Sequence, residues 1–394
     1  MKEKPWNLQL ILISIVRLIL TTGLRMAYPF LPEIARGLNV STETVSRLIS
    51  FRALAGFLSP FFGPLSEALG RKAIMLLGIA LFSMISLLVA LFPSIWTLGI
   101  ALFLIGLSKA IFDPAMQSYL GDRVPYRKRG WAVAVTEFSW SGSLLLGAPF
   151  VGLLIQLQGW SSPFLALSVL GFAFTFILGL AIPQIKGGTI GETPKFARVL
   201  KENPVIFSAA VFATLTLFAN EAIMIVYGVW MESSFNLSIT GLGLTAGLIG
   251  GGELLGELTA GLAVDRFGKR RVIIIFSALT ALIYLLIPLI SRSLWSALLS
   301  LFLLFYSFET TIVAVIPLFT ELVPQARSVM MSVSVASQSM GRALGALLGP
   351  SIYAWKGFGL SGILAFIFMF LALSIFALKV KESRPRPQAG ELRV

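Results

Sequence analysis

The chain has 394 residues, of which 57% are hydrophobic and only 12% charged. Soluble domains carry about 25% charged residues, so this composition excludes a water-soluble globular protein and indicates a bilayer as the solvent. The sequence has no cysteine and no histidine, which excludes disulfides, thiol chemistry and cysteine-based metal sites, and we expect neither a metal nor a cofactor. Without histidine, any transfer of protons has to use Asp or Glu side chains.

Twelve hydrophobic segments follow one another along the chain. Each is long enough to cross a bilayer as a helix of about 20 residues. We therefore predict an all-α membrane protein with twelve transmembrane helices. The segments lie near residues 7–30, 45–66, 73–92, 96–118, 131–155, 162–183, 204–230, 241–263, 272–290, 294–317, 329–352 and 358–379.

The longest polar stretch separates the sixth segment from the seventh and covers residues 184–203. We expect this stretch to be a cytoplasmic linker between two six-helix bundles. The N-terminal bundle comprises residues 1–183 and the C-terminal bundle residues 204–380. Residues 381–394 are the expected cytoplasmic tail.

The basic residues outside the spans are distributed unevenly between the two sides of the membrane. Of the 31 Lys and Arg residues, 22 fall in segments on the side of the N-terminus, whereas the opposite loops hold only Arg36, Arg292 and Lys356. Cytoplasmic loops are rich in Lys and Arg, so both termini are predicted to be cytoplasmic, in the plasma (inner) membrane of a prokaryote. The same asymmetry explains most of the net charge of +13, and we expect membrane lipids and a small molecule as partners rather than nucleic acid.

The two halves of the chain repeat each other at a nearly constant offset. Residues 39–41, Asn-Val-Ser, return as Asn-Leu-Ser at 236–238, and the loop at 63–72 returns at 261–270. These offsets of 197 and 198 residues are half of the chain and indicate duplication of a six-helix unit. Parallel repeats related by an axis along the membrane normal are an established plan for transporters.

Charged residues interrupt the predicted spans. Each costs about 2.5–3.5 kcal/mol at the centre of a bilayer, so these groups have to face one another, water or a solute. The third, sixth, ninth and twelfth spans carry none, which predicts that these four shield an aqueous cavity that the other eight surround. The eleven charged residues are Arg17, Arg25, Arg52, Lys109, Asp113, Glu137, Glu221, Glu253, Glu257, Glu309 and Arg342.

The signs of these charges differ between the halves, because the first half is mainly basic and the second mainly acidic. Either the halves attract each other across the cavity and a solute or protons compete with those pairs, or the substrate has both an anionic and a cationic or hydroxylated end. Arg17, Thr21 and Arg25 follow one another at i, i+4 and i+8, which predicts a polar stripe on the first helix.

Five carboxylates are candidates for proton coupling. Glu253 and Glu257 are like charges one helical turn apart, which favours a proton held between them, although a structural role beside Gly252 and Gly256 is a competing interpretation. Lys109 and Asp113 can form a local ion pair instead of a proton site. The five candidates are Asp113, Glu137, Glu253, Glu257 and Glu309.

Most aromatic residues are expected to pack between helices or to face lipid, but a few are candidates for stacking beside the cavity. Gln338 is also a candidate cavity residue, because it occupies the position in the second half that corresponds to Glu137 in the first. The predicted cavity residues are Arg17, Thr21, Arg25, Tyr28, Arg52, Trp140, Glu221, Tyr227, Glu309 and Gln338.

The repeated loops resemble the signature of the major facilitator superfamily, Gly-x-Leu-x-Asp-x-x-Gly-Arg-Lys/Arg. The first copy departs from it with Glu67 in place of the Asp and Ala68 where a basic residue is common, and the second copy matches more closely. The resemblance covers essentially the whole chain and implies a conformational latch. Its residues would be Gly63, Glu67, Gly70, Arg71 and Lys72 in the first copy, and Gly261, Asp265, Arg266, Gly268, Lys269 and Arg270 in the second.

The fifth predicted helix resembles the Gly-x-x-x-Gly-Pro-x-x-Gly motif of the drug:proton antiporters in this family. Ala148 separates the central Gly and Pro, so the match is partial, and the motif also suits simple close packing of helices. The fourth helix departs from the pattern of proton-coupled exporters, because it carries Lys109 where they have an Arg. The packing residues are Gly142, Gly147, Pro149 and Gly152, with Gly349 and Pro350 in the second half.

These observations favour a secondary active transporter that works by alternating access and exports small amphipathic compounds in exchange for protons. The alternative is uptake, exchange or flipping of an anionic solute or lipid headgroup bound by Arg17, Arg25 and Arg52. A primary pump is excluded because no Gly-x-x-x-x-Gly-Lys-Ser/Thr motif occurs, and we do not expect an enzyme. The lack of long soluble segments favours a monomer.

Overall fold

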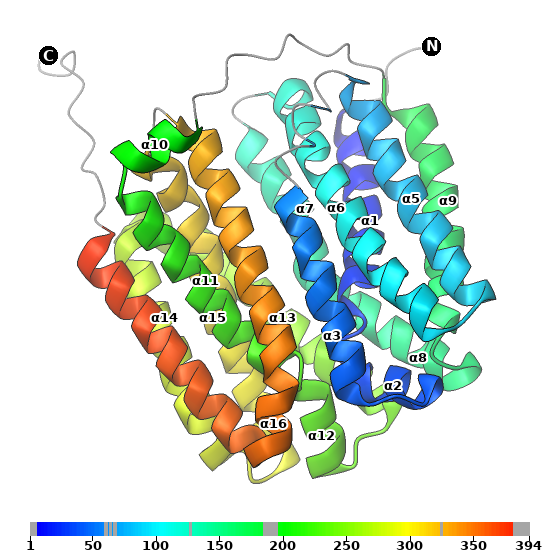
Figure 1. Cartoon of the computed structure of the whole chain (residues 1–394). Helices are drawn as coiled ribbons and strands as arrows, with labels where there is room; N and C mark the ends of the chain where they lie inside the picture. The colour runs from blue at the N-terminus through cyan, green and yellow to red at the C-terminus, as the bar shows by residue number, and fades with distance from the viewer. Residues whose placement is uncertain are drawn as a thin grey trace, which may run out of the picture.

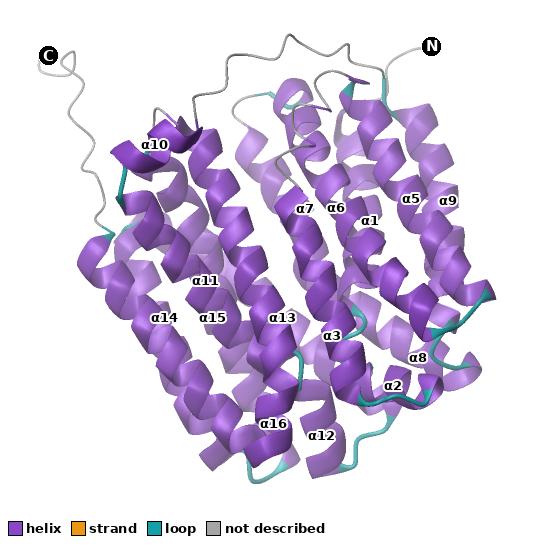
Figure 2. Ribbon diagram, in the orientation of Figure 1, coloured by secondary structure: helices purple, strands orange, loops and turns teal. Residues whose placement is uncertain are grey.

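A computed structural model describes residues 6–58, 62, 65, 69–125, 128–183, 196–323 and 326–380. Within these ranges the chain forms helices and short connections without strands (Figure 2). The helices form two bundles that stand side by side (Figure 1). This arrangement confirms the predicted all-α fold of two six-helix bundles. The predicted latch residues Gly63 and Glu67, most of the linker and the tail lie outside the described residues.

The first bundle contains the helices that precede the linker. Its last span, α9, and the hairpin of α5 and α6 pack against the broken first helix, so the charged helices α1, α6 and α7 meet inside the bundle. The elements are α1 (Trp6–Arg25), α2 (Leu31–Leu38), α3 (Thr42–Ala53), the 3-10 turn η1 (Leu54–Leu58), α5 (Arg71–Leu91), α6 (Ile95–Arg123), α7 (Arg129–Gly142), the π turn η3 (Ser143–Gly147), α8 (Ala148–Gln158) and α9 (Ser162–Ala181).

The second bundle begins after a short helix on the side of the molecule that we call the α10 side, at the top of Figure 1. The opposite side, where α2 and α12 lie, is the α2 side. The elements are α10 (Phe196–Glu202), α11 (Val205–Met224), α12 (Tyr227–Phe235), α13 (Ile239–Phe267), α14 (Lys269–Ile290), α15 (Leu294–Leu322) and α16 (Arg327–Lys379).

The backbone repeats between the bundles at the positions where the chain turns. Asn39 and Asn236 both adopt the left-handed conformation that ends a helix, with φ of 54° and 51°. The next helix then starts at an N-cap serine in each half, Ser41 or Ser238, whose hydroxyl accepts a backbone N–H. The repeated sequences therefore encode repeated turns.

The first helix of each bundle is broken at the same place. The chain leaves helical hydrogen bonding between α1 and α2 at residues 26–30, and between α11 and α12 at residues 225 and 226. Both breaks are deep in the protein, because Tyr28 is 2% exposed and Tyr227 is fully buried. Irregular backbone at this depth is tolerated only inside a protein or beside a cavity, so the breaks mark where a site can lie.

Ten helical segments of the described chain are long and apolar enough to cross a membrane. The predicted eleventh and twelfth spans are joined in α16, which contains non-helical backbone at Lys356 and Gly357. The second predicted span corresponds to α3 and η1, which lead into residues that are only partly described. These two differences explain why ten candidate spans are found among the described residues, whereas twelve were predicted.

The bundles contact each other from the middle of the spans to the α2 side. On one flank, Ser46 and Ser50 of α3 donate to the carbonyls of Ala346 and Ala343 of α16, at 2.8 and 2.7 Å. On the other flank, α13 packs against α7, η3 and α8. Glycine at position 250 allows the two backbones to meet there.

We expect Gly250→Ala to destabilise the protein. A Cβ at this position would lie 2.3 Å from the backbone nitrogen of Leu145 and 2.7 Å from the carbonyl of Ser141, both in the other bundle. Overpacking of this kind costs about 1–3 kcal/mol. Thermal unfolding in detergent, followed by tryptophan fluorescence, should show a lower Tm. Gly261→Ala on the same helix is the control, because nothing lies within 4 Å of its new Cβ. Equal Tm values for the two variants would contradict this packing.

Candidate functional site

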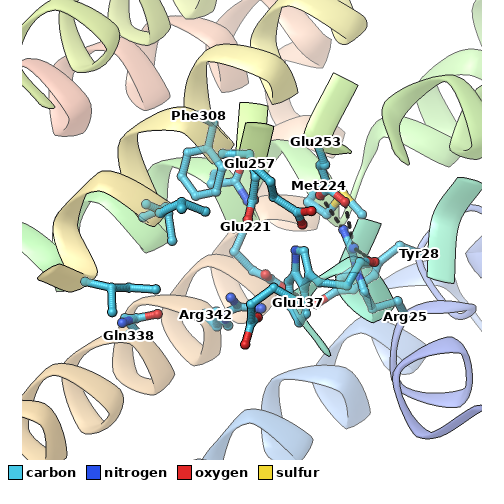
Figure 3. Close-up of a pocket in the computed structure, with 16 residues that line it drawn as sticks. Arg25, Tyr28, Glu137, Glu221, Met224, Glu253, Glu257, Phe308, Gln338 and Arg342 are labelled. Carbon is cyan, nitrogen blue, oxygen red and sulfur yellow. Dashed lines mark hydrogen bonds and ion pairs between the residues drawn. The ribbon is translucent and has the colours of Figure 1, made fainter. Parts of the chain in front are cut away.

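A cavity of about 180 Å³ lies between the two bundles, next to the break after α1 (Figure 3). Both bundles contribute to its wall, the first through α1 and α7 and the second through α11, α13, α15 and α16. Five of the lining side chains are acidic and two are basic. The lining residues are Arg25, Tyr28, Glu137, Trp140, Asn220, Glu221, Met224, Glu253, Glu257, Phe308, Glu309, Ile312, Val313, Ile316, Gln338 and Arg342.

A buried ion pair joins the bundles at this cavity. The Arg25 guanidinium donates to both oxygens of Glu253, with Nη2–Oε1 at 2.6 Å and Nη1–Oε2 at 2.8 Å. The side chains of Arg25 and Glu253 are only 4% and 3% exposed. Such a bidentate pair is strong and directional, and removal of one partner leaves a buried charge uncompensated. The pair therefore fixes α1 against α13 as long as both groups stay charged.

A second polar contact crosses between the bundles through a phenol. The Tyr28 hydroxyl donates to Oε1 of Glu221 on α11, at 2.6 Å. Arg52 of α3 donates to the same hydroxyl at 2.6 Å and also to the carbonyl of Leu24. Tyr28 thus connects a cation of the first bundle with an acid of the second, and these two groups need no direct contact.

Two guanidinium groups flank the indole ring of Trp140 on α7. The Cζ atom of Arg25 lies 4.2 Å from the ring centroid and that of Arg342, on α16, lies 4.9 Å from it. Arg25 also donates to the Trp140 carbonyl at 2.9 Å. Cation–π attraction of this kind is strongest where water is excluded, so the ring stabilises two cations of opposite bundles at once.

A separate cluster of charges lies within the first bundle. The Arg17 side chain contacts Asp113 at 3.4 Å (Nε–Oδ1), Glu137 at 3.0 Å (Nη1–Oε1) and the carbonyl of Thr136 at 2.6 Å. Lys109 is 2.6 Å from the other oxygen of Asp113. Two cations and two carboxylates balance one another here, and of these four only Glu137 reaches the cavity.

Apart from Glu221, which accepts the Tyr28 hydroxyl, three charged groups at the cavity have no ion-pair partner in the described chain. Glu309 is 6% exposed and makes no hydrogen bond or ion pair with any described residue. One oxygen of Glu257 accepts from Ser141 of the other bundle at 3.1 Å, and the second is buried without a hydrogen-bond partner among the residues that the structure describes. Arg342 contacts the Trp140 ring but makes no hydrogen bond or ion pair within the described residues. These groups are available to a ligand.

The cavity includes many, but not all, of the residues predicted to form it. Six of the ten line it, namely Arg25, Tyr28, Trp140, Glu221, Glu309 and Gln338, and so do four of the five proton-coupling candidates, Glu137, Glu253, Glu257 and Glu309. The others are not among the residues that line it. Arg17 and Arg52 are buried in polar contacts, and Asp113 pairs with Arg17 and Lys109. Thr21 and Tyr227 are fully buried, and their hydroxyls have no hydrogen-bond partner among the described residues.

Sequence reasoning missed an apolar stripe on α15. Phe308, Ile312 and Ile316 follow one another at intervals of four residues and line the cavity beside Glu309. This spacing was a detectable signal, because it puts the three side chains on one helix face with the acid. Asn220, Met224 and Val313 also line the cavity and were not predicted to do so. Arg342 was predicted to be a charged residue within a span, but not to line the cavity.

The described latch residues make contacts within their own bundle. Arg71 pairs with Asp122 and donates to the carbonyl of Ser118, and Lys269 pairs with Glu321. Arg270 donates to carbonyls at the end of α16. Gly70 and Gly268 both have positive φ, 90° and 85°, which explains glycine at the start of α5 and α14. Lys72, Asp265 and Arg266 lie on the same α10 side, and a latch role for this set stays a prediction.

The predicted packing residues lie at close approaches between helices. A Cβ at Gly147 would lie 2.4 Å from Oγ1 of Thr22, and one at Gly349 would lie 3.0 Å from the Ala222 carbonyl. Gly142, Gly152 and Pro149 lie on the same stretch, which changes from α-helix to π-helix and back between α7 and α8. Pro350 lies inside α16. These glycines therefore allow tight contacts within each bundle.

The sequence matches a family of known proteins over both halves. The family model of the Major Facilitator Superfamily matches residues 13–220 and again residues 209–393. Two separate matches, one to each half, agree with the repeat of the backbone turns.

Two bacterial relatives cover nearly the whole chain. The transporter YceJ of Bacillus subtilis (strain 168), described as an uncharacterised MFS-type transporter, is 24% identical over 370 residues, which are 92% of this chain and 93% of the relative. The quinolone resistance protein NorA of Staphylococcus aureus is 23% identical over 357 residues, or 88% of this chain and 90% of NorA.

Solved structures share the fold at low sequence identity. A bacterial homologue of the human lysosomal transporter Spinster, in an inward-facing and occupied conformation, has a TM-score of 0.76 at 14% identity and covers 98% of this chain and 100% of that one. The inward-facing and unoccupied conformation has a TM-score of 0.73 at 16% identity, with the same coverage.

We expect Arg25→Met to lower the stability of the protein strongly, by about 3–5 kcal/mol, because Glu253 is then a buried charge without its partner. The double variant Arg25→Met with Glu253→Met should recover most of the loss, since both charges are gone. Thermal unfolding followed by tryptophan fluorescence measures both. Arg198→Met is the control, because its pair with Glu202 is exposed and such pairs contribute about 0–1 kcal/mol. A double variant no more stable than Arg25→Met would argue against the pair.

Proposed function

Because the chain belongs to the major facilitator superfamily of membrane transporters, we propose that it is a secondary active transporter that exports small amphipathic compounds bearing a cationic group, in exchange for protons. The transported compound binds in the cavity between the bundles, where it competes with a proton for Glu309. As a member of this family the chain is a transporter and not an enzyme.

The single observation that carries this proposal is the position of Glu309. The residue is 6% exposed and lines the cavity, and its carboxylate has no hydrogen-bond or ion-pair partner in the described chain. A charged carboxylate in a membrane is costly unless a counter-charge is near, and a proton or a cationic ligand removes that cost equally well. Because both cannot occupy the same oxygen atoms, Glu309 couples their binding.

The balance of charges supports the same exchange. Away from their ends, where Arg47 is exposed, the spans hold five basic and six acidic side chains, so the charges inside them have one negative charge in excess. Glu257 is the second carboxylate that can take up a positive charge, because one of its oxygens is buried without a hydrogen-bond partner in the described part of the chain. The apolar stripe of Phe308, Ile312 and Ile316 beside these acids suits the hydrophobic part of an amphipathic compound.

The contacts between the bundles support alternating access. The bundles are closed on the α2 side, where Arg36 of α2 forms an ion pair with Glu232 of α12 at 2.8 Å. To open this side, the transporter has to separate Arg36 from Glu232, Arg25 from Glu253 and Tyr28 from Glu221. A bound proton or cation that changes the charge of the cavity alters the strength of those contacts, and so biases the equilibrium between the two open states.

We further propose that the α10 side faces the cytoplasm and that the closed α2 side faces outward. Most described basic residues outside the spans lie on the α10 side, whereas Arg36, Arg292 and Lys356 lie on the α2 side. This distribution follows the rule that cytoplasmic loops are rich in Lys and Arg.

The alternative, an anionic substrate bound by Arg17, Arg25 and Arg52, has less support. Arg17 and Arg25 are paired with carboxylates, and Arg52 donates to Tyr28 and to the Leu24 carbonyl. An anion would have to displace these partners, and neither Arg17 nor Arg52 is among the cavity-lining residues.

The proposal predicts proton-driven transport that depends on Glu309. In liposomes with an acidic interior, the wild-type protein should accumulate ethidium, a monovalent aromatic cation, as protons leave. Glu309→Gln should reduce this uptake about tenfold, a loss that corresponds to about 1.4 kcal/mol of interaction with the cation. Glu202→Gln, which removes an exposed acid of α10, should transport like the wild type.

Two results would count against the proposal. Uptake by the wild type that is the same with and without the pH gradient would remove the coupling to protons. Undiminished gradient-driven uptake by a folded Glu309→Gln variant would leave the coupling but remove the role of Glu309.

A further inference from the structure

An unpaired cation is the least expected feature of an acidic cavity. Arg342 of α16 lines the cavity together with five glutamates, yet its guanidinium forms no hydrogen bond or ion pair within the described chain. Arg25, the other basic residue of the wall, is held by both oxygens of Glu253. Arg342 is therefore the one lining cation of the described residues whose hydrogen-bond donors remain available.

The acids near Arg342 are engaged elsewhere or are too distant to bind it. The charge of Glu221 acts on that of Arg342, but its Oε1 atom accepts the Tyr28 hydroxyl and no ion pair joins Glu221 to the guanidinium. Glu309 is also near enough to Arg342 for their charges to interact, but no ion pair or hydrogen bond joins the two side chains. An unpaired guanidinium and an unpaired carboxylate thus line the same cavity without neutralising each other.

We propose that Arg342 is an anion-accepting subsite and that the preferred substrates are amphoteric aromatic compounds, which carry an amine and a carboxylate. The amine binds Glu309, and the carboxylate takes two hydrogen bonds from the Arg342 guanidinium, whose planar fork matches its geometry. The ring lies along the stripe of Phe308, Ile312 and Ile316 (Figure 3 labels Phe308 and Arg342 on the cavity wall).

The substrate satisfies what the protein leaves unsatisfied. Arg342 is half-buried and Glu309 is 6% exposed, so a ligand that pairs with both gains two charge-assisted contacts, whereas a ligand that pairs with only one of them gains one. A zwitterion adds no net charge, and the excess negative charge of the buried groups is then balanced by a proton on Glu257. The cation–π contact with Trp140 holds the guanidinium of Arg342 in position before the ligand arrives.

This inference rests on the proposed substrate site but not on proton coupling, so equilibrium binding tests it separately. The probes are two acid and ester pairs that differ only in the carboxyl group. One pair is 4-(aminomethyl)benzoic acid and its methyl ester, and the other is rhodamine 110 and its methyl ester, rhodamine 123. Calorimetry gives the Kd of the first pair and fluorescence anisotropy that of the second, on full-length protein in lipid nanodiscs at neutral pH.

The ratio of the acid Kd to the ester Kd isolates the interaction of the carboxylate. In Arg342→Gln we expect this ratio to rise at least about tenfold over the wild type, because the acid loses its partner while the ester keeps its amine contact. Arg342→Lys should keep part of the preference, since it keeps the charge. Arg292→Gln is the control, because it removes an exposed positive charge outside the cavity.

The outcomes are distinct. A ratio that stays the same in Arg342→Gln for both pairs overturns the inference, and so does a wild-type protein that binds neither acid. If Arg342→Gln does not fold, as judged by tryptophan fluorescence and size-exclusion chromatography, the comparison of Arg342→Lys with wild type decides. An unchanged ratio with the lysine variant then overturns the bidentate contact. Proton-driven transport can fail in liposomes while this ratio still changes, and the reverse also holds.

Discussion

The structure depends on one constraint, that a charge buried in a membrane is costly unless it has a partner. The bidentate pair between Arg25 and Glu253 meets this constraint by joining α1 of one bundle to α13 of the other. The same contact that makes each charge tolerable therefore also holds the bundles together. Tyr28 repeats the principle with Glu221, through a neutral hydroxyl. A transporter that changes which side is open has to exchange these partners for others, and protons and substrate are the natural replacements.

The backbone of the protein is nearly symmetric, but its charges are not. Helix caps, glycine turns and the break in the first helix recur in both bundles at offsets close to half of the chain. The charged side chains do not recur in this way, because the first bundle supplies most of the cations and the second most of the acids. Attraction between two different surfaces can be tuned by a small ion, whereas two identical charged surfaces would repel. Duplication provides the fold, and the unequal charges provide the site.

Much of the fold could be predicted because its signals are local. Hydrophobic length gives the spans, and Asn39 and Asn236 indicate the same helix end in each half. The ion pair of Lys109 and Asp113 could also be predicted, because the two residues are one helical turn apart. Contacts between distant segments could not be predicted. The spacing of Glu253 and Glu257 indicated two like charges close together. In the structure, Glu253 forms an ion pair with Arg25 and Glu257 accepts a hydrogen bond from Ser141. No periodicity identifies a partner 228 residues away.

The most direct test of this account measures whether the buried pair holds the bundles together. Because the chain has no cysteine, spin labels can be attached at Arg47→Cys on α3 and Ser234→Cys on α12, both exposed on the α2 side. Pulsed electron–electron double resonance in nanodiscs then gives the distance distribution between the bundles. The account predicts one narrow distribution in the otherwise wild-type protein and a longer, broader one when Glu253→Gln is added. Superimposable distributions would contradict it.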